Sequence, residues 1–283
     1  MKILRKISLL LLATMVISCS KDENEGNEGN EGNEGNEGNE NNPNLNIIPT
    51  ENTASSRGFK GNVKMVTETF FSVTTNQNGK IMKGEKKFKI VSTYNEKGLL
   101  IKEEEENGEY TLYKYDNHYK LISEIEYNKN NEIRDDEIFY KNTYDKDGKC
   151  IKIEITKNDY DDGVYDDTEI SIEKYTYNSN GKIDIKEEYY KDGKNKIIFH
   201  SRTYYKYDNN GNVIMEKSEK NGYIKKEYDE NYRLTKMEQY NSDNKLDYSM
   251  KYIYKNYDEK GNPKIKITYH GDDIDYSEFN YTY

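Results

Sequence analysis

The sequence predicts an all-β protein, a repetitive antiparallel meander of hairpins that forms a curled, open sheet or partial shell. Turn signals recur about every 8–16 residues from Gly61 to the C-terminus, apolar and polar residues alternate between them, and no stretch keeps a helical apolar period. All 29 tyrosines lie between Tyr94 and Tyr283, whereas Leu, Ile, Val and Phe make up only roughly 19% of the chain. The core must therefore be thin and built largely from tyrosine rings.

Residues 1–18 have the pattern of a secretory signal peptide. A basic start is followed by the apolar run Ile7 to Ile17, whose 11 residues are too few to span a bilayer, since a spanning helix needs about 20. The run ends in Val16-Ile17-Ser18-Cys19, which resembles the lipobox of bacterial lipoproteins. This resemblance implies that residues 1–18 are removed, that Cys19 is lipidated, and that acyl chains hold the protein to the outer membrane. A plain secretory signal with a chance cysteine is the alternative.

The four residues after the cysteine, Ser20, Lys21, Asp22 and Glu23, resemble the export signal of surface lipoproteins in one phylum of Gram-negative bacteria. The resemblance implies that the protein faces the exterior. The alternative is that these residues merely begin an acidic linker. Removing the signal peptide takes away three basic residues and leaves 40 basic against 53 acidic ones, a net charge of −13. Such a protein is not expected to adhere electrostatically to anionic lipid.

Residues 19–57 are expected to form a lipidated, disordered tether. Asn24-Glu25-Gly26 repeats five times in tandem through Gly38, and nothing in this composition can be buried. A flexible chain of about 38 residues has a root-mean-square span of roughly 30–37 Å. The segment would lift the folded part clear of the membrane, although replication slippage without a selected length explains the repeat equally well.

Residues 58–283 are expected to form one repetitive β domain. The commonest unit is Tyr-Asp or Tyr-Asn, two polar residues, usually Gly, and then alternation, as in Tyr144-Asp145-Lys146-Asp147-Gly148. Asn-Gly and Asp-Gly pairs, among them Asp192-Gly193 and Asn210-Gly211, are suited to positive φ. A single hairpin cannot fold alone, so stability must be collective. We expect Ile and Tyr rings on the concave side and Lys and Glu outside.

The units resemble the YD repeats of Rhs-type proteins, with Tyr207-Asp208-Asn209-Asn210-Gly211-Asn212-Val213 the nearest match. The resemblance covers roughly residues 85–270. It implies antiparallel strands that curl into a shell and says almost nothing about activity. There are too few repeats to enclose a large cavity, and no toxin domain follows them, so toxin encapsulation is not implied.

The sequence offers little for catalysis. His118, His200 and His270 are not at metal-ligand spacing, and no nucleophile elbow, phosphate loop or zinc-protease motif occurs. Cys150 is expected to be an ordinary strand residue. The segment Asn158 to Glu169 is expected to be an acidic hairpin loop, with calcium binding as an alternative. We therefore predict no enzyme, cofactor or metal, and the acidic balance predicts no nucleic-acid partner.

These observations predict a surface-exposed lipoprotein of the outer membrane that presents a tyrosine-rich β-repeat domain for binding or adhesion to a glycan or an extracellular protein. The alternative is a structural or accessory component of a cell-envelope assembly with no ligand of its own. The turn tyrosines are expected to affect folding. Strand tyrosines that point away from the Ile face are the candidate ligand contacts: Tyr175, Tyr204, Tyr252 and Tyr254.

Overall fold

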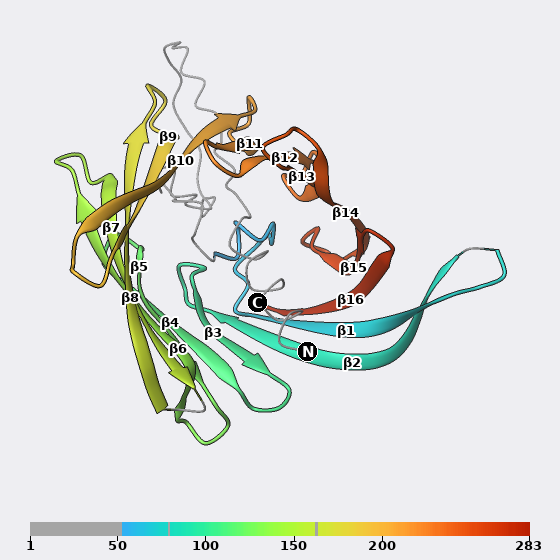
Figure 1. Cartoon of the computed structure of the whole chain (residues 1–283). Coiled ribbons are helices and arrows are strands. Elements are labelled where there is room, and N and C mark those ends of the chain that lie inside the picture. Colours follow the sequence, from blue (N-terminus) through green and yellow to red (C-terminus); the bar gives the residue numbers. More distant parts are fainter. Residues whose placement is uncertain (1–52, 79, 162–163) are drawn as a thin grey trace, which may run out of the picture.

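The computed structural model describes residues 53–283, except residues 79 and 162–163. In this part the chain forms sixteen antiparallel strands and no helix (Figure 1). In chain order the strands are β1 (Met65–Thr75), β2 (Ile81–Tyr94), β3 (Leu100–Glu105), β4 (Tyr110–Tyr115), β5 (Leu121–Tyr127), β6 (Ile133–Tyr144), β7 (Cys150–Asp161), β8 (Val164–Tyr177), β9 (Ile183–Lys191), β10 (Ile197–Tyr207), β11 (Val213–Ser218), β12 (Gly222–Tyr228), β13 (Leu234–Tyr240), β14 (Leu246–Tyr257), β15 (Pro263–His270) and β16 (Asp273–Thr282).

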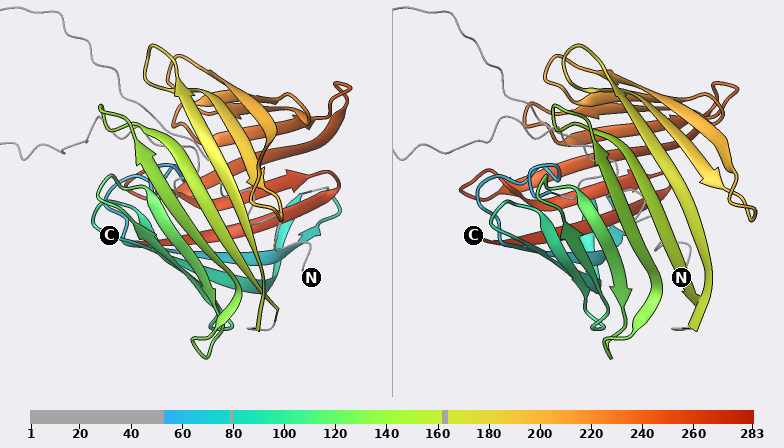
Figure 2. Two further views of the ribbon diagram at one scale, coloured as in Figure 1. Left: turned by 60° about the vertical axis from the view of Figure 1, so that its left-hand side comes forward. Right: turned by 90° about the vertical axis from the view of Figure 1, so that its left-hand side faces the viewer.

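The sheet closes into a barrel, so the expectation of an open sheet or partial shell is wrong. Each strand pairs with its neighbour in sequence, and β1 pairs with β16 from Met65 opposite Thr282 to Phe71 opposite Tyr276. Two views from the side show the strands running obliquely around the wall (Figure 2). Closure gives backbone partners to the two outermost strands, which would otherwise remain as free edges.

The register identifies which side chains point into the barrel. The segment before β1 lies within the ring of strands (Figure 1), and its Arg57 contacts Ser92 and Glu103, so these two side chains point inward. Residues that are directly paired share a face, as do alternate residues of one strand. Following these two rules from Glu103 around all sixteen strands leads back to Ser92 without contradiction.

The inner face carries charges as well as rings, which corrects the expectation that Ile and Tyr would fill it. The ion pairs Lys186–Glu173 (3.3 Å) and Lys266–Glu68 (2.8 Å) lie on it, as does the pair between Lys226 and Glu216. Within the described residues, apolar burial is divided among three separate clusters, one of which contains Cys150, Ile153, Tyr175 and Tyr205. A ring of sixteen strands is too wide for side chains to meet at its centre, so inward residues need polar partners along the wall.

The two ends of the barrel differ. All connections from an even-numbered strand to the next strand lie at one end, which we call the rim, and they contain the Tyr-Asp and Tyr-Asn turns. The connections from odd-numbered strands lie at the opposite end, which we call the far end. The chain enters the described part at the rim, where Thr53 pairs with Leu99. Residues Thr53 to Arg57 thus pack against the barrel, although the sequence places them in the tether.

Ten turns in the described residues share one hydrogen-bonding scheme. In Asp208 to Asn212, for example, the Asp208 carboxylate accepts hydrogen bonds from the N–H groups of Asn210 and Asn212, and the third residue after it, Gly211, has a φ of 92°. The turn at Asp192 follows the same scheme, so positive φ falls on Asn195 and not on Gly193 as the sequence analysis expects. The left-handed position is therefore set by its distance from the capping side chain.

Candidate functional site

A ring of tyrosines fastens neighbouring hairpins at the rim. The Tyr177 hydroxyl donates to the carbonyl of Cys150 (2.6 Å), and Tyr207 does the same to Ile183 (2.7 Å). Each acceptor is the first residue of the strand that follows the previous rim turn. The same arrangement recurs in the bonds Tyr115 to Leu100, Tyr228 to Val213, Tyr254 to Leu234 and Tyr281 to Pro263. Each of these part-buried hydroxyls thus finds its acceptor on the neighbouring hairpin.

The segment before β1 packs across the rim. The backbone N–H of Ala54 donates to the carbonyl of Gly98 (2.8 Å), beside β3. Asn262, before β15, is fully buried, accepts from the N–H of Lys60 (2.6 Å) and donates to the Lys60 carbonyl (2.9 Å). These contacts hold the segment at points on the rim that are distant in sequence, so the N-terminal connection is part of the folded barrel.

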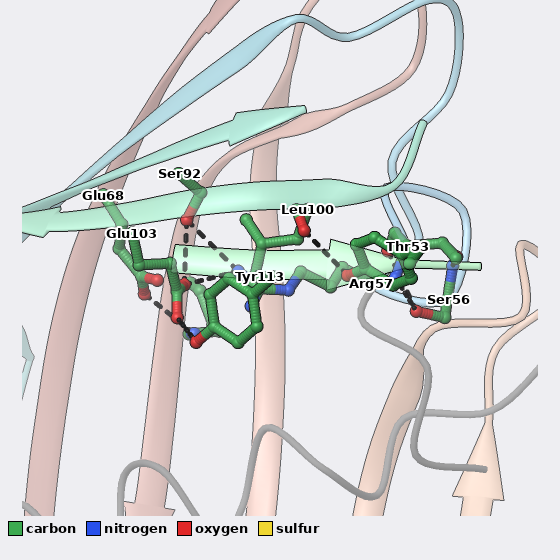
Figure 3. A network of polar contacts seen from close by, with 10 residues as sticks. Thr53, Ser56, Arg57, Glu68, Ser92, Leu100, Glu103 and Tyr113 are labelled. Atoms are coloured by element: carbon green, nitrogen blue, oxygen red, sulfur yellow. Dashed lines mark hydrogen bonds and ion pairs between the residues drawn. The ribbon is translucent and has the colours of Figure 1, made fainter. Parts of the chain in front are cut away.

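The same segment delivers one arginine to the inner wall (Figure 3). The Arg57 guanidinium donates to Glu103 (2.9 Å) and Ser92 (3.2 Å), while Ser92 (3.0 Å) and Tyr113 (3.1 Å) also donate to Glu103. Only 8% of the Arg57 side chain is exposed, and its Nε and Nη2 have no hydrogen-bond partner in the described part of the chain. The arginine therefore neutralises an inward carboxylate and ties the N-terminal segment to β2, β3 and β4.

Electrostatics divide the inward carboxylates into two kinds. Burial alone would raise the pKa of Glu103, but the charge of Arg57 and the donors around the carboxylate hold that pKa below its usual value. Burial raises the pKa of Glu124 to about 7, helped by the neighbouring charges of Glu126 and Glu103. Burial and nearby aspartates raise the pKa of Glu126 to about 7 as well. Near neutral pH, β5 therefore presents two partly protonated carboxyl groups to the lumen.

The four candidate tyrosines do not form one site. Tyr175 and Tyr252 are buried, which corrects the expectation that they point away from the core, because both lie on the inward face within apolar clusters. Tyr254 is half-buried, belongs to the rim ring, and lines a small pocket with Arg57 and Arg233. Tyr204 alone is exposed, on the outer wall.

Tyr204 belongs to a partly exposed group on β9 and β10, which we call the outer patch and which consists of Tyr189, Phe199, Arg202 and Tyr204. The rings of Tyr189 and Phe199 meet edge to face at 5.6 Å, and the Arg202 guanidinium lies 5.8 Å from the Phe199 ring. The Tyr204 hydroxyl donates to Glu219 (2.8 Å). Phe199 keeps 41% and Tyr204 37% of its surface exposed. The patch thus offers apolar faces and fixed charges together, a combination that suits contact with another molecule.

Ionised side chains occupy the outer wall on many strands. On β3 Lys102 pairs with Glu104 (2.6 Å), and on β13 Lys236 pairs with Glu238 (2.8 Å). Such residues lie in the middle of their strands and alternate with inward ones. Further outward charges are Lys152 and Glu154 on β7, Lys174 on β8, Glu187 on β9, Arg202 on β10, Lys225 on β12 and Lys251 on β14. A lipid-facing wall needs an apolar band about 25 Å tall, and a cation at mid-membrane costs about 2–4 kcal/mol.

The remaining chemical candidates of the sequence have ordinary surroundings. Cys150 is a buried member of an apolar cluster, and burial raises the pKa of its thiol. His118 stacks on Tyr144 with ring centroids 4.2 Å apart, and His270 hydrogen-bonds Asp275 (2.9 Å). No group of His, Cys, Asp and Glu side chains in the described residues converges to hold a metal ion. The centre of the acidic segment Asn158 to Glu169 lies outside those residues.

Cys19 and the segment Ser20 to Glu23 also lie outside the described residues. Within the described part, no helix is long and apolar enough to cross a membrane.

Sequence reasoning missed the Arg57 network and the two glutamates of β5, Glu124 and Glu126, that face the interior of the barrel. Arg57 sits at the end of an Asn/Glu-rich tether, and nothing in that composition marks a residue for burial. Glu124 and Glu126 alternate with Ile125 and Tyr127, so the pattern shows two opposite faces without revealing which of them points inward. Only closure of the barrel decides that question.

No family model and no curated protein matches the chain. Among solved structures, it is similar to a porin-like protein from Bacteroides uniformis, at 12% identity and a TM-score of 0.42 over 79% of this chain and 98% of that one. A porin-like protein from Bacteroides vulgatus gives 12% identity and a TM-score of 0.33 over 78% and 98%. The Tc holotoxin pore of Photorhabdus luminescens gives 16% and 0.30, over 75% of this chain but 11% of that one. At these TM-scores the likenesses carry no inference about function.

Proposed function

We propose that this protein is a lipoprotein of the outer membrane whose barrel stands outside the lipid, faces the exterior and presents a binding surface. The observation that carries the proposal is the charged outer wall. Ion pairs in the middle of β3 and β13, and the pair nearer the rim end of β7, would face acyl chains if the barrel spanned a membrane, and each cation there would be costly. A barrel with such a wall is stable in water, so attachment would depend on the acyl chains at Cys19.

The experiment compares the wild type with Cys19→Ala in membrane fractions. We expect the wild type to remain with the outer membrane after an alkaline carbonate wash, and Cys19→Ala, where the thiol that accepts lipid is missing, to become soluble and still folded. Cys150→Ala, which removes the other cysteine of the chain and keeps Cys19, is the matched control and should stay with the membrane. A Cys19→Ala barrel that resists the wash and remains folded in the membrane would show that the wall itself faces lipid.

Orientation is tested separately on intact cells. The residues Ser20 to Glu23 favour an outward-facing protein, so added protease should cut the Asn-Glu-Gly repeat, whose composition gives it nothing to pack against. The barrel should survive as a released fragment. Cleavage that occurs only after the outer membrane has been opened would place the protein in the periplasm.

The outer patch is the proposed contact for a glycan or an extracellular protein. Replacing Tyr204 with Ala should leave the thermal midpoint within a few degrees, because exposed substitutions usually cost under about 0.5 kcal/mol. The same change should weaken binding of any partner found in an array screen by about 1–3 kcal/mol. Tyr205→Ala, at the adjacent buried position, is the control that should unfold the barrel instead.

The alternative of a structural or accessory component is favoured by a different observation. Three of the four candidate tyrosines stabilise the barrel itself: two are buried in its apolar clusters, and Tyr254 belongs to the ring of tyrosines at the rim. A protein of this second kind would bind nothing in the array screen, and replacing Phe199 and Tyr204 together would alter only its association with other envelope proteins.

A further inference from the structure

Two hairpins at the far end carry opposite charge, and each has a strand edge without a strand partner in the described residues. The basic arm is the part of β1–β2 that projects past the adjacent strands (Figure 1). β1 pairs with β16 only as far as Phe71, and β2 pairs with β3 only from Ile90, so residues 72–75 and 81–89 bond chiefly to each other. Both strands of this arm therefore keep an outer backbone edge without a strand partner in the described part of the molecule.

The arm is strongly basic in an acidic protein. Its positive residues are Lys80, Lys83, Lys86, Lys87 and Lys89, and Glu85 is its one acidic residue. Lys83 is held by Glu278 (2.8 Å) and Lys86 by Glu106, whereas the other three lysines make no ion pair with the described residues. Since like-charged arms repel one another, this arm is suited to an acidic partner and opposed to pairing with itself.

The acidic hairpin is the end of β7–β8. β8 pairs with β9 only from Ser171 onward, so the strand from Val164 to Ile170 also has an edge without a strand partner in the described residues. Its acidic residues in the described part of the chain are Asp159, Asp161, Asp166, Asp167 and Glu169, of which Asp159 pairs with Lys157. The other four make no ion pair with the described part of the chain.

We propose that two copies of this chain associate head to head at their far ends, with the basic arm of each copy against the acidic hairpin of the other. Four strands, β3 to β6, separate the two hairpins around the barrel. A two-fold axis perpendicular to the barrel and midway between the hairpins exchanges their positions. That single operation makes both contacts at once and closes the dimer.

The occupant of the arm is a second copy because the chain itself supplies the matching charge. Interspersed charges of opposite sign on the two hairpins give specificity and fast association that salt screens, with a Debye length of about 8 Å at physiological ionic strength. The far end is opposite to the rim, where the chain enters the barrel. The contact is therefore compatible with copies held on two facing membranes.

The test reverses the charge of each element separately and then combines the two reversals. Association is measured as molar mass by light scattering on the full chain in detergent, at low and high salt. Lys80→Glu, Lys87→Glu and Lys89→Glu together form the arm reversal. Asp161→Lys, Asp166→Lys and Asp167→Lys together form the hairpin reversal. We expect the wild type to be dimeric at low salt and monomeric at high salt, and each reversal to weaken association on the order of a hundredfold.

Association should return in two combinations. A chain that carries both reversals should dimerise, and an equimolar mixture of the two singly reversed proteins should form a heterodimer, because each mixed contact again joins opposite charges. The matched control changes three exposed rim lysines, Lys97→Glu, Lys146→Glu and Lys260→Glu, with the same total change in charge, and should stay dimeric.

Three results would overturn the proposal. They are a wild type that is monomeric at low salt, an arm reversal that remains dimeric, or a combination of the two reversals that fails to restore association while the urea midpoint shows a folded barrel. A monomeric wild type that binds a sulfated polysaccharide through the arm, and loses it on arm reversal, would assign the arm to a polyanion instead. None of these results bears on whether Cys19→Ala releases the barrel, so the two proposals fail independently.

Discussion

The rim and the far end are formed by the same strands, but their connections differ in regularity. At the rim, each turn has a capping Asp or Asn side chain and a left-handed third residue, tyrosines reach across to the neighbouring hairpins, and the N-terminal segment packs against them. The same cap also occurs in three fully described far-end turns, those of Asn128, Asp192 and Asn241. At the far end the connections differ in length, charge and projection. Removing a buried polar partner next to the rim should therefore cost more than changing an exposed far-end side chain, whereas Gly222 is a far-end position where close backbone contact makes a substitution costly.

The largest effect is expected from Arg57→Ala, which leaves Glu103 buried without its cation. Removing one partner of a buried ion pair costs about 3–5 kcal/mol, and we expect the urea midpoint to fall accordingly. Arg57→Met combined with Glu103→Leu should be much milder, because no uncompensated charge remains. If the single change proves as mild as the double one, the N-terminal segment contributes little to the stability of the rim.

The pH dependence of stability should come from Glu124 and Glu126. Their pKa values in the folded barrel are raised from 4.5 to about 7, so folding favours the protonated form. The contribution is fully present below the unfolded value near 4.5 and is lost as pH rises through about 7. For Glu124 the loss is on the order of 3 kcal/mol, at 1.36 kcal/mol for each pKa unit.

Urea midpoints measured from pH 5 to pH 8 should therefore fall as the pH rises. Glu124→Gln, which keeps the shape and removes the titration, should flatten that slope. Glu187→Gln, on the outer wall, is the control and should leave the slope almost unchanged, because the hydrogen bond from Arg202 holds the pKa of the Glu187 carboxyl below its usual value. A slope that persists unchanged in Glu124→Gln would assign the pH dependence to other groups.

A third prediction compares one glycine from each end. Gly222, after the far-end turn, has a φ of 83°, and an added Cβ would lie 2.0 Å from the carbonyl oxygen of Tyr240. Gly148, in a rim turn, has a φ of 78° with open space around it. Gly222→Ala should cost more than about 2 kcal/mol, since backbone must move, whereas Gly148→Ala should cost about 1–2 kcal/mol for the left-handed conformation alone. Equal thermal midpoints would show that β13 shifts easily.

Sequence alone predicts the strands well and the closure poorly, for a physical reason. The alternation from Cys150 to Thr156 correctly marks the start of β7, and the Tyr-Asp pairs mark the rim turns, because both signals are local. Closure depends on β1, which has no tyrosine and joins residues more than two hundred positions away in β16. The direction in which each strand faces, and hence the burial of Tyr175 and the exposure of Tyr204, follows only once the ring is closed.

The smallest effect is expected at the tyrosine hydroxyls. Tyr177→Phe keeps the ring and removes the hydrogen bond to the Cys150 carbonyl, so the barrel should lose about 0.5–1.5 kcal/mol. Tyr207→Phe should lose a similar amount, because its bond to Ile183 has nearly the same length and setting. Tyr165→Phe is the far-end control: this ring is 55% exposed and its hydroxyl bonds only Thr168, so its urea midpoint should match that of the wild type. The double variant Tyr177→Phe with Tyr207→Phe then decides whether the ring acts as a unit. A loss larger than the sum of the two single losses would mean that neighbouring hydroxyls support one another around the rim, whereas simple additivity would mean that each hairpin is fastened separately.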